Sequence, residues 1–141
     1  MKRDFFINLE DKNNQHLPLN EVVEQLAFDS QGLIPVIVQD ATSMQVLMFA
    51  WMNKATLMQT IETKRMTYWS RSRQQIWIKG ETSGHTQHVK SVSIDCDGDA
   101  VLCLVDQMGA ACHTGRKDCF YLNVNEDGDS IHIEGKARLD F

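Results

Sequence analysis

Residues 89–105 read VKSVSIDCDGDAVLCLV, two apolar runs on either side of an acidic segment. Val89–Ile94 and Val101–Val105 have the length and the β-branched content typical of strands. Further strand-sized runs lie on both sides of this stretch, at Thr67–Trp69, Ile76–Ile78 and Phe120–Val124. Because these runs do not alternate regularly with helices, the sequence predicts an α+β fold with a largely antiparallel sheet, not a doubly wound parallel one.

The first half of the chain supplies the predicted helices. Apolar residues recur at helical spacing over residues 19–26, and Asn53 is placed to cap a second helix. Leu33–Gln39 and Val46–Trp51 are apolar runs separated by a polar segment, which predicts a hairpin or neighbouring strands. Near the end of the chain, Asp-Gly before Ile131–Ile133 is a weak hairpin signal. We therefore expect two or so helices and a mainly β second half.

The composition restricts the class of protein. A length of 141 residues predicts one domain over residues 1–141, and 43% hydrophobic with 23% charged residues excludes a disordered chain. The net charge of −5 argues against a general nucleic-acid binder. No apolar run of signal-peptide length opens the chain, and the longest, Val46–Met52, is far short of the ~20 residues that span a bilayer. We expect a cytoplasmic protein with reduced cysteines and no membrane contact.

The acidic segment is a candidate site for a hard metal ion. If it is extended, Asp95, Asp97 and Asp99 fall on one face at ~6–7 Å spacing, where they repel one another unless Mg²⁺ or Ca²⁺ binds. Gly98 would let the backbone bend so that the carboxylates converge. The alternative is a plain acidic turn. An EF-hand loop is unlike this segment, because Ala100 occupies its glycine position and a strand follows directly.

The cysteines are candidates for a softer metal. Cys96 would point away from the aspartates on an extended segment, and Cys112 and Cys119 follow it with His113 adjacent. Three thiolates with one open position are typical of catalytic zinc, although three inert buried cysteines remain the alternative. Cys103 lies inside an apolar run, so we expect it to pack in the core.

Two polar segments carry materials for a phosphate site. Hydroxyl, guanidinium and ammonium groups lie close to glycines, whose backbone N–H groups also bind phosphate. The candidate substrate-binding residues are Ser70, Arg71, Ser72, Arg73, Lys79, Glu81, Thr82 and Ser83. The alternative is a solvated strand face and loop. His85 either performs acid–base chemistry near neutral pH or lies on the surface.

Four motifs taken together closely resemble the phosphoribosyl-AMP cyclohydrolase family of histidine biosynthesis. They are SRSR at 70–73, WIKGETSGH at 77–85, DCDGD at 95–99 and ACHTG at 111–115. The resemblance covers about residues 32–121 in order and without large gaps. One departure is Lys117-Asp118 before the last cysteine, where the family more often has serine immediately before it.

The resemblance implies an obligate homodimer with two metals. It implies that Cys96 of one subunit binds Zn²⁺ with Cys112 and Cys119 of the other. It also implies a Mg²⁺ site made of Asp95, Asp97 and Asp99.

The resemblance also implies a reaction. Water would add to C6 of the adenine ring of 1-(5-phosphoribosyl)-AMP, and the N1–C6 bond would open to give the phosphoribosyl-formimino imidazole carboxamide ribotide. Zinc lowers the pKa of bound water to ~7, and His113 or His85 would carry protons to N1. Magnesium would hold a substrate phosphate, with the candidate partners Arg71, Ser72, Arg73 and Lys79.

Two other classes remain for comparison. A structural zinc module that binds RNA or a protein would use the basic and aromatic strands, but the net charge of −5 is unfavourable for holding a polyanion. A zinc deaminase also attacks a ring carbon, but its combined signature, H-x-E followed by P-C-x-x-C, is absent from the sequence.

Overall fold

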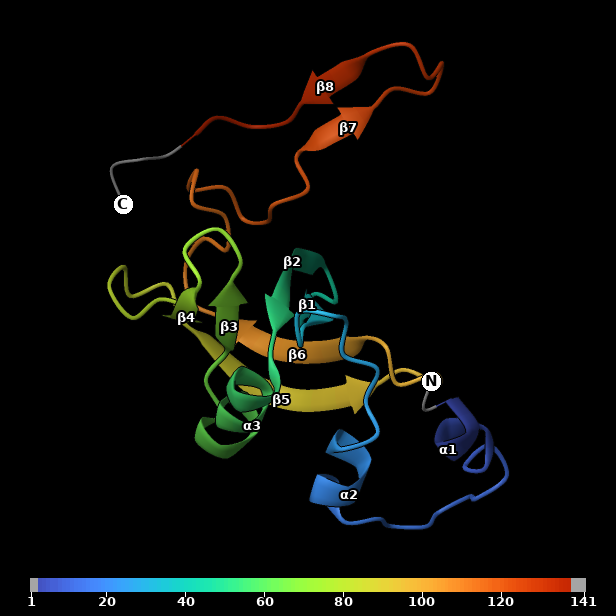
Figure 1. The fold of residues 1–141 in the computed structure, drawn as a ribbon. Helices are drawn as coiled ribbons and strands as arrows, with labels where there is room; N and C mark the ends of the chain where they lie inside the picture. Colours follow the sequence, from blue (N-terminus) through green and yellow to red (C-terminus); the bar gives the residue numbers. More distant parts are fainter. Residues whose placement is uncertain (1–2, 138–141) are drawn as a thin grey trace.

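A four-stranded sheet forms the centre of the protein (Figure 1). The computed structural model describes residues 3–137. The sheet has the order β2-β1-β6-β5 and consists of β1 (Ile34–Asp40), β2 (Val46–Met52), β5 (Gln87–Ile94) and β6 (Val101–Gln107). The β1–β2 and β5–β6 pairs are antiparallel, whereas the central β1–β6 pair is parallel. The predicted α+β class and largely antiparallel sheet are confirmed; the parallel pair was not predicted.

Three helices accompany this sheet, namely α1 (Arg3–Ile7), α2 (Leu19–Val23) and α3 (Lys54–Thr63). Asn53 caps α3 as predicted, because its side chain accepts from the Thr56 N–H at 2.8 Å and Thr56 Oγ1 accepts from the Asn53 N–H at 3.0 Å. Helix α2 is shorter than predicted, and α1 was not predicted. No helix within residues 3–137 is both long enough and apolar enough to cross a membrane.

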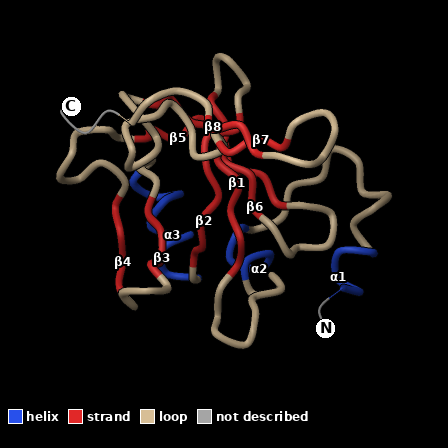
Figure 2. Tube along the Cα trace, turned by 90° about the horizontal axis from the view of Figure 1, so that it is seen from above, coloured by secondary structure: helices blue, strands red, loops and turns tan. Residues whose placement is uncertain are grey.

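The core lies between the sheet and helices α2 and α3, which cover one face of the sheet (Figures 1 and 2). Val36 and Val38 of β1 and Leu57 of α3 are almost fully buried in it. Cys103 is fully buried in the same core, as predicted, and burial raises the pKa of its thiol to about 12. This thiol therefore stays protonated at neutral pH.

The opposite face of the sheet carries apolar side chains that stay exposed in the described part of the chain. Ile37 of β1 pairs with Phe49 of β2, and the two side chains are 38% and 48% exposed. The Phe49 ring meets Trp51 edge-on with centroids 5.5 Å apart. Exposed apolar patches of this kind are typical of interaction surfaces.

Two smaller hairpins complete the fold. One consists of β3 (Thr67–Ser70) and β4 (Gln75–Ile78). The other consists of β7 (Leu122–Val124) and β8 (Ile131–Ile133), and it confirms the hairpin signal near the end of the chain. In Figure 1 the β7–β8 hairpin stands apart from the sheet, on the side opposite α2 and α3.

Helix α1 packs on the loop between β5 and β6. The Phe6 ring is 6% exposed and lies against Gly98, where an added Cβ would stand 2.2 Å from the ring. Gly98 has φ +70°, a conformation that favours glycine, and its carbonyl accepts from the Ala27 N–H at 2.8 Å. The N-terminal segment therefore supports the acidic loop.

Gly98→Ala is expected to destabilise the protein by about 3 kcal/mol, because the substitution adds the strain of a positive φ to the loss of Phe6 burial. Gly32→Ala is the matched control, since Gly32 has φ +76° but nothing within 4 Å of an added Cβ. The free energy of unfolding of the control should fall by only about 1 kcal/mol. Urea unfolding measures the free energy of unfolding of both variants. If both lose the same amount, the Phe6 contact does not contribute to stability.

Candidate active site

The β5–β6 loop is a turn, which the sequence analysis kept as the alternative to an extended segment. Asp95 Oδ1 accepts from the backbone N–H groups of Asp97 at 3.2 Å and Asp99 at 2.9 Å, and the positive φ of Gly98 reverses the chain. One ligand atom from each of Asp95, Cys96 and Asp97 lies within 4.8 Å of the others. Cys96 therefore lies beside these two aspartates, and the prediction that it points away from them is wrong.

The crowded carboxyls affect each other's protonation. Partial burial alone would raise the pKa of Asp95, but the hydrogen bonds from the Asp99 and Asp97 N–H groups outweigh it, so its pKa is lowered. The pKa of Asp99 is raised, because its side chain hydrogen-bonds to the charged Asp95. Oxygen donors in this arrangement suit a hard divalent cation, which would relieve the repulsion.

Cys112 and Cys119 lie together in the segment after β6. Burial alone would raise the pKa of the Cys112 thiol, but hydrogen bonds from Thr114 and from the Cys119 thiol, with the charge of Arg116, lower it. Burial and the neighbouring Cys112 raise the pKa of Cys119 to about 11. The Cys119 N–H donates to the Leu47 carbonyl at 2.8 Å, which ties this segment to β2. Two adjacent thiols, one of them with a lowered pKa, fit half of a zinc site.

Cys96 cannot join these two thiols within one chain. It precedes β6, whereas Cys112 and Cys119 follow β6. A strand of seven residues spans roughly 20 Å. Zinc–sulfur bonds are about 2.3 Å long, and among the described residues the three cysteines do not form one ligand cluster.

A cavity of about 520 Å³ brings most of the predicted catalytic and substrate-binding residues together. It lies beside β4 and the loop that follows it. Among its lining residues are Arg73, Lys79, Glu81, Thr82, Ser83, His85, Cys112 and His113. Segments from residues 73–85 and 110–113 thus meet around one space, whose volume suits a small-molecule ligand.

Three of the predicted substrate-binding residues do not line this cavity. The Arg71 guanidinium lies over the Trp51 ring, 4.6 Å from its centroid. Ser70 Oγ accepts from the Arg73 N–H at 3.3 Å, and Ser72 contacts Ser70 in the same turn. They belong to the turn between β3 and β4, and only Arg73 of that turn lines the cavity.

Lys79 is held next to the cysteines, not in the solvent. Its Nζ donates to the Ala111 carbonyl at 2.6 Å and lies 5.3 Å from the centroid of the Trp77 ring. Burial lowers the pKa of Lys79, and the nearby thiols of Cys119 and Cys112 oppose that shift. The ammonium group is therefore placed to stabilise thiolates.

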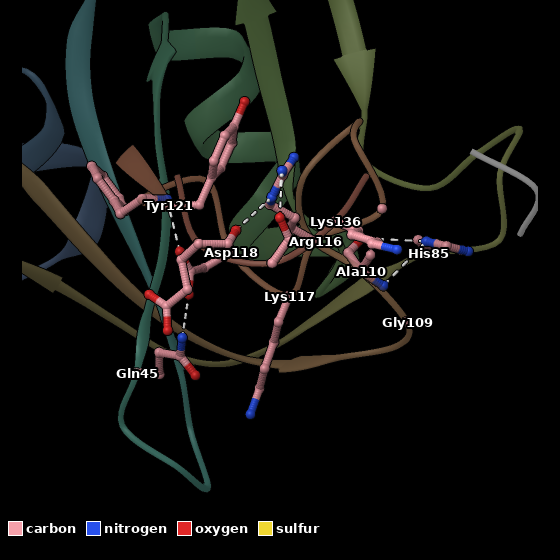
Figure 3. Close-up of a pocket in the computed structure, with 13 residues that line it drawn as sticks. Gln45, His85, Gly109, Ala110, Arg116, Lys117, Asp118, Tyr121 and Lys136 are labelled. Carbon is pink, nitrogen blue, oxygen red and sulfur yellow. Dashed lines mark hydrogen bonds between the residues drawn. The ribbon is translucent and has the colours of Figure 1, made fainter. Parts of the chain in front are cut away.

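A second cavity of about 700 Å³ adjoins the first, and both are lined by His85 and Ala110 (Figure 3). His85 Nδ1 lies 3.2 Å from the Ala110 backbone nitrogen and 3.3 Å from the Ala110 carbonyl oxygen, so the backbone of Ala110 holds the ring in place. Sequence reasoning missed this cavity. Its basic lining residues Arg116, Lys117 and Lys136 come from a loop and from the segment after β8, and only the pair of basic residues at 116–117 was a signal.

The departure from the family pattern at Asp118 has a local partner. Asp118 accepts hydrogen bonds from the Gln45 side chain and from the Phe120 N–H, the latter at 2.7 Å. The nearby Asp118 charge also contributes to the raised pKa of Cys119. This carboxylate therefore links the cysteine segment to the turn between β1 and β2.

Comparison with known proteins gives a consistent result. A sequence profile of the family described as "Phosphoribosyl-AMP cyclohydrolase" matches residues 48–121. A protein of that name from Corynebacterium jeikeium is 60% identical over 99 residues, which cover 70% of this chain and 78% of the relative. Those from Hydrogenovibrio crunogenus and Cereibacter sphaeroides are 57% and 50% identical, over 74% and 77% of this chain and 71% and 92% of the relatives.

Proposed function

The chain belongs to the phosphoribosyl-AMP cyclohydrolase family, enzymes of histidine biosynthesis, and on this premise we propose that it hydrolyses the N1–C6 bond of the adenine ring of 1-(5-phosphoribosyl)-AMP. The observation that carries the proposal is the 520 Å³ cavity, where His113, Cys112 and Arg73 face one space. Such a cavity offers a proton carrier, a metal ligand and a cation for phosphate. The product keeps both phosphoribosyl groups.

Zinc is held by Cys112 and Cys119 of one subunit and Cys96 of the partner subunit. The adjacency of two thiols and the distance of the third support this assignment, as does Lys79 beside the thiols. When bound, zinc supplies water with a pKa near ~7. The chain acts as a homodimer because one copy cannot complete the ligand set.

The open face of the sheet supports the same dimer. Ile37 of β1 and Phe49 of β2 are exposed on it, and a two-fold axis in the plane of the interface would pack the two sheets face to face. An axis that runs perpendicular to the strands in this plane reverses the strand direction between the copies. The β5–β6 loop of each copy would then lie at the end of the sheet where the other copy carries its paired cysteines.

The chain's own residues handle the proton and the phosphates. His113 is exposed in the cavity and delivers the proton to N1, whereas His85 is held by Ala110 and orients the loop. Arg73 and the hydroxyl of Ser83 bind one phosphoribosyl group. The adjoining cavity, lined by basic residues that include Lys117 and Lys136, receives the other.

The test is a direct assay with phosphoribosyl-AMP. Purified protein should convert it with the loss of the adenine chromophore, lose activity after chelation, and regain it when Zn²⁺ and Mg²⁺ are restored. Restoring Zn²⁺ and Mg²⁺ separately shows whether activity requires one of these metals or both. Turnover by fully metal-free protein would contradict the zinc assignment, and no turnover with both metals present would contradict the function.

The hard-metal site is expected to respond separately from zinc. Asp97→Asn should raise the Mg²⁺ concentration needed for half-maximal activity by about tenfold or more, because it removes one charged ligand. Zinc content, measured by atomic absorption, should stay nearly constant. If Asp97→Asn instead releases zinc and leaves the Mg²⁺ requirement unchanged, the loop serves zinc alone.

A further inference from the structure

The hairpin of β7 and β8, here named the arm (residues 122–133), has an apolar face that residues 3–137 do not cover. Leu122 pairs with Ile133 and Val124 with Ile131, so these four side chains share one face of the arm. Their exposures run from 54% to 67%. An isolated two-stranded hairpin is at best marginally stable in water, and an exposed apolar face adds a further cost. The arm therefore lacks a packing surface.

The root of the arm is held firmly in place (Figure 3). Arg116 donates to the carbonyls of Glu134 at 2.9 Å and Gly135 at 3.0 Å, and its guanidinium lies 3.9 Å from the centroid of the Tyr121 ring. The Glu134 N–H donates to the Tyr121 carbonyl at 2.9 Å. Both strands are thus anchored where they leave the body of the protein, and the arm points away from its own sheet in Figure 1.

The tip of the arm is also well organised. Asn125 Oδ1 accepts from the Asp129 N–H at 3.1 Å, and the Asn125 N–H donates to the Ser130 carbonyl at 3.0 Å. The apolar face thus lies on an element with a defined register. A defined register with four aligned aliphatic side chains indicates a specific packing partner.

The position of the arm identifies that partner. Cys119 stands three residues before the arm, and under the proposed function it shares zinc with Cys96 of the partner subunit. The partner must therefore lie next to the root of the arm. We propose that the apolar face of the arm packs against a second copy of this chain, at the end of its sheet that carries the β5–β6 loop. This inference rests on the proposed function.

By two-fold symmetry each copy extends one arm to the other. Arm docking and completion of the zinc site would then occur in the same assembly step, because Arg116 connects the arm root to the cysteine segment. Weakening the arm should weaken the dimer without changing any group that touches substrate. Activity should then fall on dilution and return at high protein concentration.

The test uses the zinc-loaded full chain. The double substitution Val124→Ser with Ile131→Ser should raise the dimer dissociation constant about tenfold or more, measured by sedimentation equilibrium, because two aliphatic side chains lose their burial. Asn123→Ala with His132→Ala is the matched control, since this pair occupies the other face of the same hairpin. The control should leave the dissociation constant unchanged.

A measurement on the wild-type chain covers the case in which the substitutions unfold the arm. Amide hydrogen exchange in β7 and β8 should slow when the protein concentration is raised through the dimerisation range. The inference is overturned if the Val124→Ser, Ile131→Ser variant keeps the wild-type dissociation constant, or if hydrogen exchange in the arm does not change on dimerisation. Either result leaves zinc binding and turnover unaffected. A wild-type chain that stays monomeric or binds no zinc overturns the proposed function itself.

Discussion

Mixing a Cys96→Ala chain with a Cys112→Ala chain is expected to restore activity to about one quarter of the wild-type value, although each variant alone is inactive. The reason is the separation of these cysteines at the two ends of β6. In a mixed dimer one zinc site has all three cysteines and the other lacks two. Random exchange of subunits places half of the chains in mixed dimers, each with one of two sites intact. Activity with phosphoribosyl-AMP after subunit exchange is the measurement.

A mixture of Cys112→Ala and Cys119→Ala chains is the matched control. These two cysteines lie together in one subunit, so every site in the mixture lacks one ligand and activity should stay absent. Cys103→Ala should keep its zinc, because this thiol is buried in the core. Recovery in the control mixture, or full activity of the Cys96→Ala chain alone, would refute a zinc site shared between subunits.

His113→Ala is expected to lower kcat by about 10²–10⁴-fold with little change in KM. That range is typical for the loss of a positioned proton carrier. His113 lines the cavity next to Cys112 but is itself exposed, so the fold should tolerate the change. Steady-state kinetics with phosphoribosyl-AMP measures the effect, and zinc content should be checked in the same samples.

Two comparisons separate proton transfer from simple structural damage. Added imidazole should restore part of the kcat of the His113→Ala enzyme, which it would not do if the loss came from misfolding. His88→Ala serves as the matched control, because His88 is exposed on β5 and lines neither of the two cavities beside the cysteines. If the His113→Ala enzyme has a normal kcat, the proton is carried by His85 and not by His113.

The strands of the central sheet could be predicted from the sequence because each buries side chains on one face, and alternating or continuous apolar runs report that burial directly. The direction in which distant strands pair leaves no such pattern. Val36 of β1 aligns in parallel with Val101 of β6, and nothing in either run distinguishes this from antiparallel pairing. Helix α1 was missed for a similar reason, since its one well-buried contact, Phe6 on Gly98, joins segments far apart in the sequence.

The residue types of the site could be predicted from the sequence, but not which groups each side chain contacts. Arg71 and Arg73 look equivalent in the sequence, yet one stacks on Trp51 and the other lines the cavity, because the turn between β3 and β4 points them differently. Lys79 lines the cavity as expected of a phosphate ligand, but its position beside the thiols of Cys112 and Cys119 could not be read from the sequence. The basic lining of the larger cavity includes residues after β8, where no motif marks them.

The parallel pairing of β1 with β6 also affects how the chain folds. The two strands are neighbours in the sheet, but β2, α3, β3, β4 and β5 lie between them in the sequence. They therefore meet only after this long segment has been looped out. Closing so long a loop costs entropy before any native contact compensates for it, and non-local pairings of this kind place domains among the slower folders, with times of milliseconds to seconds. During that interval the β1–β2 hairpin can form early, because it is local, and it exposes Ile37 and Phe49 while the rest assembles. The nascent enzyme is therefore most exposed to misassociation on the same surface that we propose for the dimer.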